Sequence, residues 1–253
     1  EMQRSLVGSE MCIRDRLCNL LWFEIEGGTV MKYMSVITNF GCHYKCPYCI
    51  VKENNLHIPR TTLSGLDNLE EALKENNCDI VSISGGGDPL HEYEKHIDWY
   101  RKFFGIAHKR NVFFNGSMRP IPVEMHTSYM TDETAFPFYD CYRVVYHANS
   151  IDQLSHIRRT GNEIVRAVFV VTADYTIADI MDIALFVKNS TEIDELSFRQ
   201  LVDDKYTEQH YLEDYLRMGH KKLWWYIEQN DYNLYYAEND VSGRYRDFEK
   251  EVL

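Results

Sequence analysis

Asn39-Phe-Gly-Cys-His-Tyr-Lys-Cys-Pro-Tyr-Cys-Ile50 is the stretch from which the fold and the chemistry of this chain can be interpreted. It follows a β-rich run and contains Cys42, Cys46 and Cys49 at the spacing Cys-x3-Cys-x2-Cys. Thiolates of this kind bind zinc and iron–sulfur clusters. Three of them leave one position of a metal site open, and an open position is where a metal site carries out chemistry.

The composition limits what such a site can serve. The 253 residues are 45% hydrophobic and 26% charged, which is typical of a globular chain with a sizeable core. A formal net charge of -12 argues against nucleic acid as a partner, because phosphate binding requires clustered Lys and Arg. The sequence shows no apolar run of membrane-spanning length and no secretory signal, so we expect no membrane partner. Seven cysteines, an odd number, fit a metal or redox site in a reducing compartment, and we expect a cytoplasmic protein.

The first thirty residues differ from the rest, because they show neither helical nor strand periodicity. Residues 1–16 resemble translated sequencing-adapter read-through. We therefore expect residues 1–30 to be a non-native or disordered leader and the native chain to begin at Met31. Cys12 and Cys18 then have no functional role.

From Met31 onward, short β-rich runs alternate with longer helical patterns, which is typical of a parallel sheet covered by helices. Near-continuous apolar runs such as Ile80–Ile83 and Ile164–Val171 indicate strands buried on both faces. The pattern predicts an α/β fold, a partial (β/α)6 TIM-like barrel. The expected strands lie near 33–39, 79–84, 111–115, 142–147, 164–171 and 194–199, and the expected helices over 66–75, 89–104, 150–159 and 177–188. We expect a core barrel over 31–205, followed over 206–253 by a helix within 209–227 and an edge strand at 232–236 that pack on it.

The cysteines lie just beyond the carboxyl end of the first expected strand, at the rim where αβ barrels place their active sites. With the aromatic Tyr48 directly before Cys49, the motif resembles the signature of the radical S-adenosylmethionine (radical SAM) superfamily. The resemblance implies a radical SAM barrel in which Cys42, Cys46 and Cys49 hold a 4Fe-4S cluster, with S-adenosylmethionine on the fourth iron. Such an oxidoreductase cleaves S-adenosylmethionine reductively to a 5'-deoxyadenosyl radical that abstracts hydrogen from a substrate. The resemblance also implies an electron donor such as flavodoxin or ferredoxin. Because such a cluster is sensitive to oxygen, it further implies that the protein needs anaerobic handling.

A glycine-rich motif follows the second expected strand, in the order that the resemblance requires. Ser84-Gly-Gly-Gly-Asp-Pro-Leu90 resembles the family motif Gly-Gly-Glu-Pro. The resemblance implies that this segment holds the methionine end of the cofactor, because glycines let a backbone approach a ligand closely. The aspartate is one methylene shorter than the family glutamate, so a backbone role is expected and a direct side-chain contact is left open. The residues concerned are Gly85, Gly86, Gly87 and Asp88.

Three further cofactor-side candidates follow from the resemblance. Tyr48 is expected near the adenine, and Asn115 stands in the turn Asn115-Gly116 after the third expected strand. Arg199 lies in Ser197-Phe-Arg-Gln-Leu201 on the sixth expected strand. For Arg199 a carboxylate contact, to substrate or cofactor, and a buried ion pair both remain open.

Other interpretations of the same residues also remain. A zinc-stabilised or degenerate barrel would use the cysteines as a binding protein without turnover. Within the enzyme class no second cysteine cluster follows residue 201, so peptide maturases with auxiliary clusters match poorly, whereas glycyl-radical-enzyme activases and 7-carboxy-7-deazaguanine synthase stay possible. The substrate, a small molecule or a peptide, is not determined. His147, Cys78 and Cys141 are interpreted as structural residues of the barrel.

Overall fold

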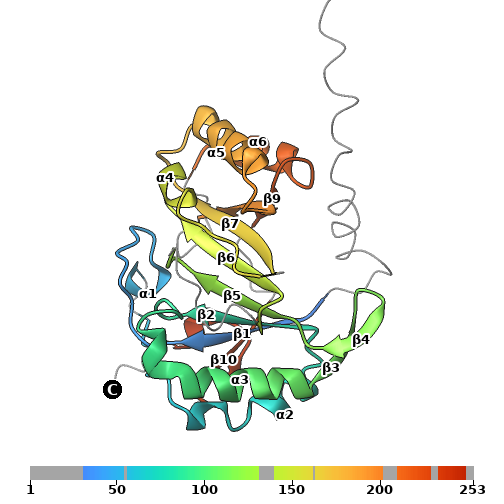
Figure 1. The fold of residues 1–253 in the computed structure, drawn as a ribbon. Coiled ribbons are helices and arrows are strands. Elements are labelled where there is room, and N and C mark those ends of the chain that lie inside the picture. Colours follow the sequence, from blue (N-terminus) through green and yellow to red (C-terminus); the bar gives the residue numbers. More distant parts are fainter. Residues whose placement is uncertain are drawn as a thin grey trace, which may run out of the picture. The chain divides into compact units, whose positions relative to one another are not determined.

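A curved sheet of mostly parallel strands organises the chain in the computed structural model, which describes residues 31–53, 56–130, 140–161, 163–201, 210–228 and 233–248 (Figure 1). The expected leader over 1–30 lies outside these described residues. The strands of the main sheet are β1 (Tyr33–Thr38), β2 (Ile80–Gly85), β5 (Val123–Thr127), β6 (Arg143–Ala148), β7 (Ile164–Val171), β8 (Glu195–Gln200), β9 (Trp225–Ile227), β10 (Leu234–Ala237) and β11 (Asp240–Ser242). Their spatial order is β11-β10-β1-β2-β5-β6-β7-β8-β9.

The strand order confirms the predicted fold class. β1, β2, β5, β6, β7 and β8 are neighbours in chain order, and every pair in the sheet is parallel except β10 with β11. Parallel neighbours require crossover connections, and among the described residues helices lie in the connections β1–β2, β2–β5, β6–β7, β7–β8 and β8–β9. The helices are α1 (Ile50–Glu53), α2 (Leu69–Glu75), α3 (Ile97–Lys109), α4 (Ile151–Leu154), α5 (Ile177–Asn189) and α6 (Glu213–Gly219).

The convex face of the sheet carries the apolar core. Side chains alternate between the two faces of a strand, and those that face the helices are fully buried, among them Met34, Val81, Ile83, Met125 and Val144. α3 contributes an aromatic stripe to this layer, with Trp99, Tyr100, Phe103 and Phe104 buried. α5 begins with a capping box, in which Thr176 and Asp179 satisfy each other's backbone N–H groups. The convex layer supplies most of the hydrophobic stabilisation.

The concave face carries polar and charged side chains beside apolar ones such as Val145 and Val168. Ser82 Oγ donates to Ser35 Oγ at 2.9 Å, and Arg143 Nε on β6 lies 3.2 Å from Glu195 Oε2 on β8. Because β7 lies between β6 and β8, the contact of Arg143 with Glu195 spans one strand, and the inward curve of the sheet brings the two side chains together. We call this side the lumen face; by contact or by strand alternation it includes Ser35, Ser82, Glu124, His126, Arg143, His147, Arg166, Glu195, Ser197 and Arg199.

One strand was predicted in the wrong place. Residues 111–115 do not enter the main sheet; β3 (Asn111–Phe114) pairs with β4 (Ser117–Pro120) in a separate antiparallel hairpin. The third barrel strand is β5, which the sequence analysis missed. Asn115 and Gly116 both have positive φ, 51° and 77°, as a two-residue hairpin turn requires. The apolar run Val112–Phe114 therefore belongs to a hairpin and not to the barrel.

The other expected elements differ from the structure mainly at their ends. α5 and β7 match the predicted ranges closely, whereas the helix expected over 89–104 begins at Ile97, after a 3-10 turn at Tyr93–His96. The helix expected within 209–227 is limited to α6, because residues 225–227 form β9 beside β8. β10 pairs with β1, and β11 adds a further strand outside it. No helix in the described ranges is long and apolar enough to cross a membrane.

The Glu124 carboxylate gives a testable pH dependence. Burial alone would raise its pKa, but Arg143, His126 and Arg166 outweigh burial and lower it to about 2. The unfolded pKa is about 4.3, so this group stabilises the fold above that pH, and the contribution is lost as the pH falls toward about 2. Urea unfolding from neutral pH downward should show a steeper loss of stability in the wild type than in Glu124→Gln. Equal slopes, with the surface variant Glu70→Gln as control, would contradict this assignment.

Candidate functional site

The three cysteines lie on one loop at the carboxyl edge of the sheet, where the parallel strands end. The loop follows β1, and Cys49 N donates to Cys46 O at 3.3 Å in a turn that leads into α1. Cys42 is exposed, and Cys46 and Cys49 are half-buried. Burial raises the pKa of the Cys46 thiol, and the neighbouring Cys42 and Cys49 raise it further, while a hydrogen bond with Asn149 lowers it. The three sulfurs are therefore close enough to influence one another.

The three cysteines of the loop fit an iron–sulfur cluster better than they fit a single metal ion. In the described part of the chain, no group of three His, Cys, Asp or Glu side chains converges on a point where a single metal ion would sit. The cysteines of an iron–sulfur cluster each bind a different iron and need no such convergence. The donor set, three cysteines on one loop, fits a cluster with one iron left to another ligand.

The glycine-rich segment packs directly against the cysteine loop. A Cβ on Gly87 would lie 2.1 Å from the Gly41 carbonyl oxygen, and a Cβ on Gly85 would lie 1.6 Å from the Gly87 carbonyl oxygen. Gly86 N donates to Thr38 O at 2.8 Å. Only glycine allows this approach, so the ends of β1 and β2 are held together by backbone. The structure thus brings the two predicted motifs to one place.

Asp88 has a structural role that the sequence did not reveal. Its carboxylate is 4% exposed and accepts hydrogen bonds from Leu90 N at 2.9 Å, Thr127 Oγ1 at 2.7 Å and Ser128 N at 2.6 Å. Its own N–H donates to Gly41 O at 2.9 Å. Since its acceptor capacity is used within the protein, the side chain is committed to joining the ends of β1, β2 and β5. A direct contact of the Asp88 side chain to a cofactor stays a prediction.

Tyr48 is tied to the fourth barrel strand. Its hydroxyl donates to Oδ1 of Asn149, which follows β6 directly. Burial raises the pKa of Tyr48, and Cys46 raises it further, so the phenol stays protonated and acts as a donor. Asn149 thereby contacts both Tyr48 and Cys46, and it was missed by the sequence analysis.

A second residue that the sequence analysis missed comes from the far end of the chain. Tyr245 lies in a 3-10 turn at Tyr245–Phe248, and its hydroxyl donates to Gly85 O at 2.9 Å. Burial raises the pKa of Tyr245, and the nearby Cys49 raises it further. The residue thus lies under the glycine segment and beside the cysteine loop. A tyrosine two hundred residues from the motif gives no signal in sequence, because only the fold brings it there.

The segment after α1 covers the same place. Asn39 Nδ2 donates to Ile58 O at 2.8 Å, and Ile58 packs with Leu56, Ile37 and Ala237 in one apolar cluster. A Cβ on Gly86 would meet the Ile58 side chain at 2.5 Å. The segment thereby excludes water from the back of the glycine segment.

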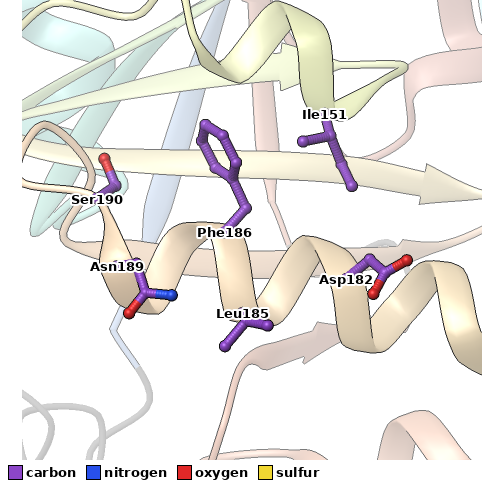
Figure 2. A pocket seen from close by; sticks show the side chains of 6 residues that line it. All are labelled: Ile151, Asp182, Leu185, Phe186, Asn189 and Ser190. Atoms are coloured by element: carbon purple, nitrogen blue, oxygen red, sulfur yellow. The ribbon is translucent and has the colours of Figure 1, made fainter.

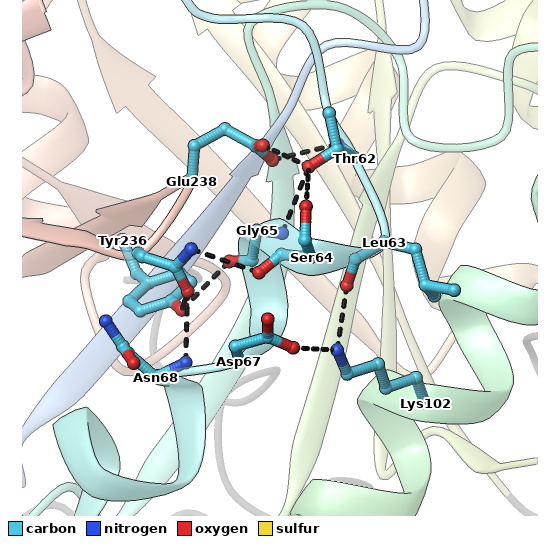
Figure 3. A network of polar contacts seen from close by, with 10 residues as sticks. Thr62, Leu63, Ser64, Gly65, Asp67, Asn68, Lys102, Tyr236 and Glu238 are labelled. Carbon is cyan, nitrogen blue, oxygen red and sulfur yellow. Dashed lines mark hydrogen bonds and ion pairs between the residues drawn. The ribbon is translucent and has the colours of Figure 1, made fainter.

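Polar contacts fix the continuation of this segment to the C-terminal strands (Figure 3). Glu238 accepts from Thr62 N at 2.9 Å, and Tyr236 donates to Gly65 O at 2.9 Å. On the other side, Lys102 Nζ donates to Leu63 O at 2.9 Å and pairs with Asp67. β10 and its turn are therefore part of the support of the site.

The structure does not bring Asn115 together with the other predicted site residues, because it lies in the turn of the β3–β4 hairpin. The β3–β4 hairpin lies at the amino edge of the sheet, away from α1 (Figure 1). Phe114 contacts Tyr142, the residue before β6, with ring centroids 5.2 Å apart, and Ile121 N donates to Arg110 O at 2.7 Å just before β5. The carboxyl end of the third barrel strand instead carries Thr127.

Arg199 and His147 both lie near the carboxyl end of their strands on the lumen face. His147 Nε2 is 3.2 Å from His126 Nδ1, and His126 Nε2 is 3.6 Å from Glu124 Oε2. Arg199 Nε is buried without a hydrogen-bond partner among the described residues. The buried ion pair that the sequence left open for Arg199 is not present among the described residues. Cys78 and Cys141 are buried, as predicted.

A pocket of about 390 Å³ lies elsewhere, on the outer helical layer (Figure 2). It is lined by α5 and the start of α4, with Phe186 and Leu185 from α5 and Ile151 from α4. Asp182 is its one charged lining residue. The pocket contains none of the predicted site residues and has no part in the chemistry considered below.

Comparison with known proteins supports the fold. No protein-family model matches the sequence, and no curated protein does. Among solved structures, SuiB of Streptococcus suis bound to the precursor peptide SuiA has a TM-score of 0.56 and 13% identity, covering 88% of this chain and 63% of its own. A radical SAM methyltransferase from Sphaerobacter thermophilus gives a TM-score of 0.47 and 11% identity, covering 83% of this chain and 69% of its own. The chain thus shares the fold of SuiB, with its curved and mostly parallel sheet, and it spans less than two thirds of the length of SuiB.

Removing one acceptor from Asp88 should loosen the strand ends. In Asp88→Asn an amide N–H₂ group faces a backbone or hydroxyl donor inside the protein, so one buried donor loses its partner. The expected cost is about 1–3 kcal/mol of unfolding free energy, measured by urea denaturation. The matched control is Asp174→Asn, at an exposed aspartate before α5, which should change stability by less than about 0.5 kcal/mol. An Asp88→Asn protein as stable as the wild type would contradict the role assigned to this carboxylate.

Proposed function

We propose that this chain is a radical SAM enzyme in which Cys42, Cys46 and Cys49 hold one 4Fe-4S cluster. The observation that carries the proposal is the packing of the glycine segment against the cysteine loop at the carboxyl edge of a radical SAM-type barrel. When bound, the reduced cluster supplies one electron to the sulfonium of S-adenosylmethionine, which breaks to methionine and a 5'-deoxyadenosyl radical. Low cluster potentials of this kind depend on charge, hydrogen bonds and exposure around the sulfurs.

The residues of the chain bind and orient in this proposal. The backbone of Gly85–Gly87 would border the methionine end of the cofactor, since it lies against the cysteine loop. Tyr48, fixed by Asn149, would border the adenine. Tyr245 holds the glycine segment from beneath by its bond to the Gly85 carbonyl. Together with the segment around Ile58, these contacts keep water from the reacting centre, which a radical reaction requires.

The partners of the reaction belong to the same proposal. An electron donor such as flavodoxin or ferredoxin would reduce the cluster. SuiB is bound to a precursor peptide, and this supports a peptide substrate for the present chain in preference to a small molecule. A glycyl-radical-enzyme activase or a 7-carboxy-7-deazaguanine synthase-like enzyme remains the alternative that would use the same site.

Anaerobic reconstitution with iron and sulfide tests the proposal. The wild type should become brown, bind about four irons per chain and form 5'-deoxyadenosine from S-adenosylmethionine under dithionite. Cys46→Ala should lose both the cluster and the cleavage, because a thiolate ligand is removed. The matched control is Cys78→Ala, which changes a buried cysteine far from the loop and should keep both properties. A colourless wild-type protein with one equivalent of zinc would instead support the zinc-stabilised binding protein.

A further inference from the structure

The lumen face holds more positive charge than it pairs. Glu124 accepts from Arg143 in an ion pair, and Glu195 Oε2 lies 2.6 Å from Arg166 Nε and 3.2 Å from Arg143 Nε. The carboxylates of Glu124 and Glu195 are therefore the partners of the Arg143 and Arg166 guanidinium groups. Arg199 is the third guanidinium of the same face, and no carboxylate contacts it in the described ranges.

The environment of Arg199 makes an unpaired cation expensive. Burial lowers the pKa of Arg199, and its Nε is inaccessible to water and has no hydrogen-bond partner among the residues described. Arg199 as a residue is half-buried, but its Nε is cut off from water without a partner, and such a buried donor costs free energy through desolvation. The cost is offset when a carboxylate accepts two parallel N–H bonds from the planar guanidinium.

The side chains around Arg199 do not supply that carboxylate. On one side of Arg199 are the histidines of β5 and β6. Burial lowers the pKa of His126 and of His147, and the positive charge of Arg199 lowers both pKa values further. On the other side Tyr235 of β10 is close enough to interact with it electrostatically. β8 and β10 are far apart in the sheet order, so Arg199 and Tyr235 face each other across the lumen.

The two histidines are joined to Glu124 in a row of contacts. The Glu124 carboxylate lies 3.6 Å from His126 Nε2, and His126 Nδ1 lies 3.2 Å from His147 Nε2. Burial lowers the pKa of both histidines, which favours their neutral forms. Because His126 directs its N–H toward Glu124, His147 directs its single N–H toward His126, and the other ring nitrogen of His147 is an acceptor. Arg199 is therefore the donor that this part of the lumen face offers to an anion.

We propose that Arg199 binds a carboxylate group of the substrate in the lumen. The inference rests on the proposed function and adds the substrate class: a molecule that carries a carboxylate near the carbon from which hydrogen is abstracted. S-adenosylmethionine also carries a carboxylate, and it is the other source that the test must separate.

A binding experiment with glutarate, a small dicarboxylate, tests the proposal. Binding to the reconstituted wild type is measured anaerobically by calorimetry, and the neutral analogue glutaramide is the control. Glutarate should bind and glutaramide should not. Arg199→Gln should weaken glutarate binding about tenfold or more, as expected for the loss of a charged hydrogen-bonded pair. Arg199→Lys, which keeps the charge without the planar fork, should weaken binding less. Arg101→Gln on exposed α3 should bind as the wild type does.

Saturating S-adenosylmethionine separates the two sources of carboxylate. Glutarate that still binds in its presence supports a substrate site. Glutarate displaced by S-adenosylmethionine would assign Arg199 to the cofactor and overturn the inference, as would equal binding by the wild type and Arg199→Gln, or no binding by the wild type. Glutarate binding involves no turnover, so its failure is distinct from a failure to form the cluster or to cleave S-adenosylmethionine.

Discussion

The buried carboxylate of Asp88 is the interaction on which the candidate site depends. It accepts from Leu90 N, Thr127 Oγ1 and Ser128 N, while its own N–H binds Gly41 O. These bonds join the ends of three neighbouring parallel strands at the edge where barrels of this kind place their chemistry. A buried carboxylate is stable only when its oxygens are hydrogen-bonded. The loops must therefore keep their positions to supply these hydrogen bonds, and the bonds in turn hold the loops in place. The cysteine loop and the glycine segment are held in register by this tie.

The two faces of the sheet divide the tasks of stability and chemistry. The convex face is apolar and packs on helices, which stabilises the fold by burial. The lumen face instead carries serines, histidines and three arginines, and its ion pairs stabilise the fold less than apolar packing of the same volume would. Such a face is expected where a polar ligand has to be held. The site is completed by Tyr245 and the β10 turn from the C-terminal part of the chain.

The sequence predicted the barrel and the cysteine loop because both leave local signals. Apolar runs such as Ile164–Val171 predict buried strands, and three cysteines in one turn predict a metal site. The sequence-based prediction of the third barrel strand was wrong for two reasons. Val112–Phe114 is as apolar as a barrel strand, although it forms a hairpin. Val123–Thr127, the actual strand, contains Glu124 and His126 and does not have the pattern of a buried strand. The partners of Asp88, and the roles of Asn149 and Tyr245, could not be predicted. Each depends on residues distant in sequence, and a single asparagine or tyrosine has no pattern that separates a site residue from a surface one.

Electron paramagnetic resonance of the reduced, reconstituted protein tests most directly whether the three cysteines leave one iron for S-adenosylmethionine. The spectrum should be that of a reduced 4Fe-4S cluster, and its g values should shift when S-adenosylmethionine is added, because the cofactor binds the iron that has no cysteine ligand. A cluster signal that does not respond to S-adenosylmethionine, or a protein that binds zinc and gives no signal, would contradict it.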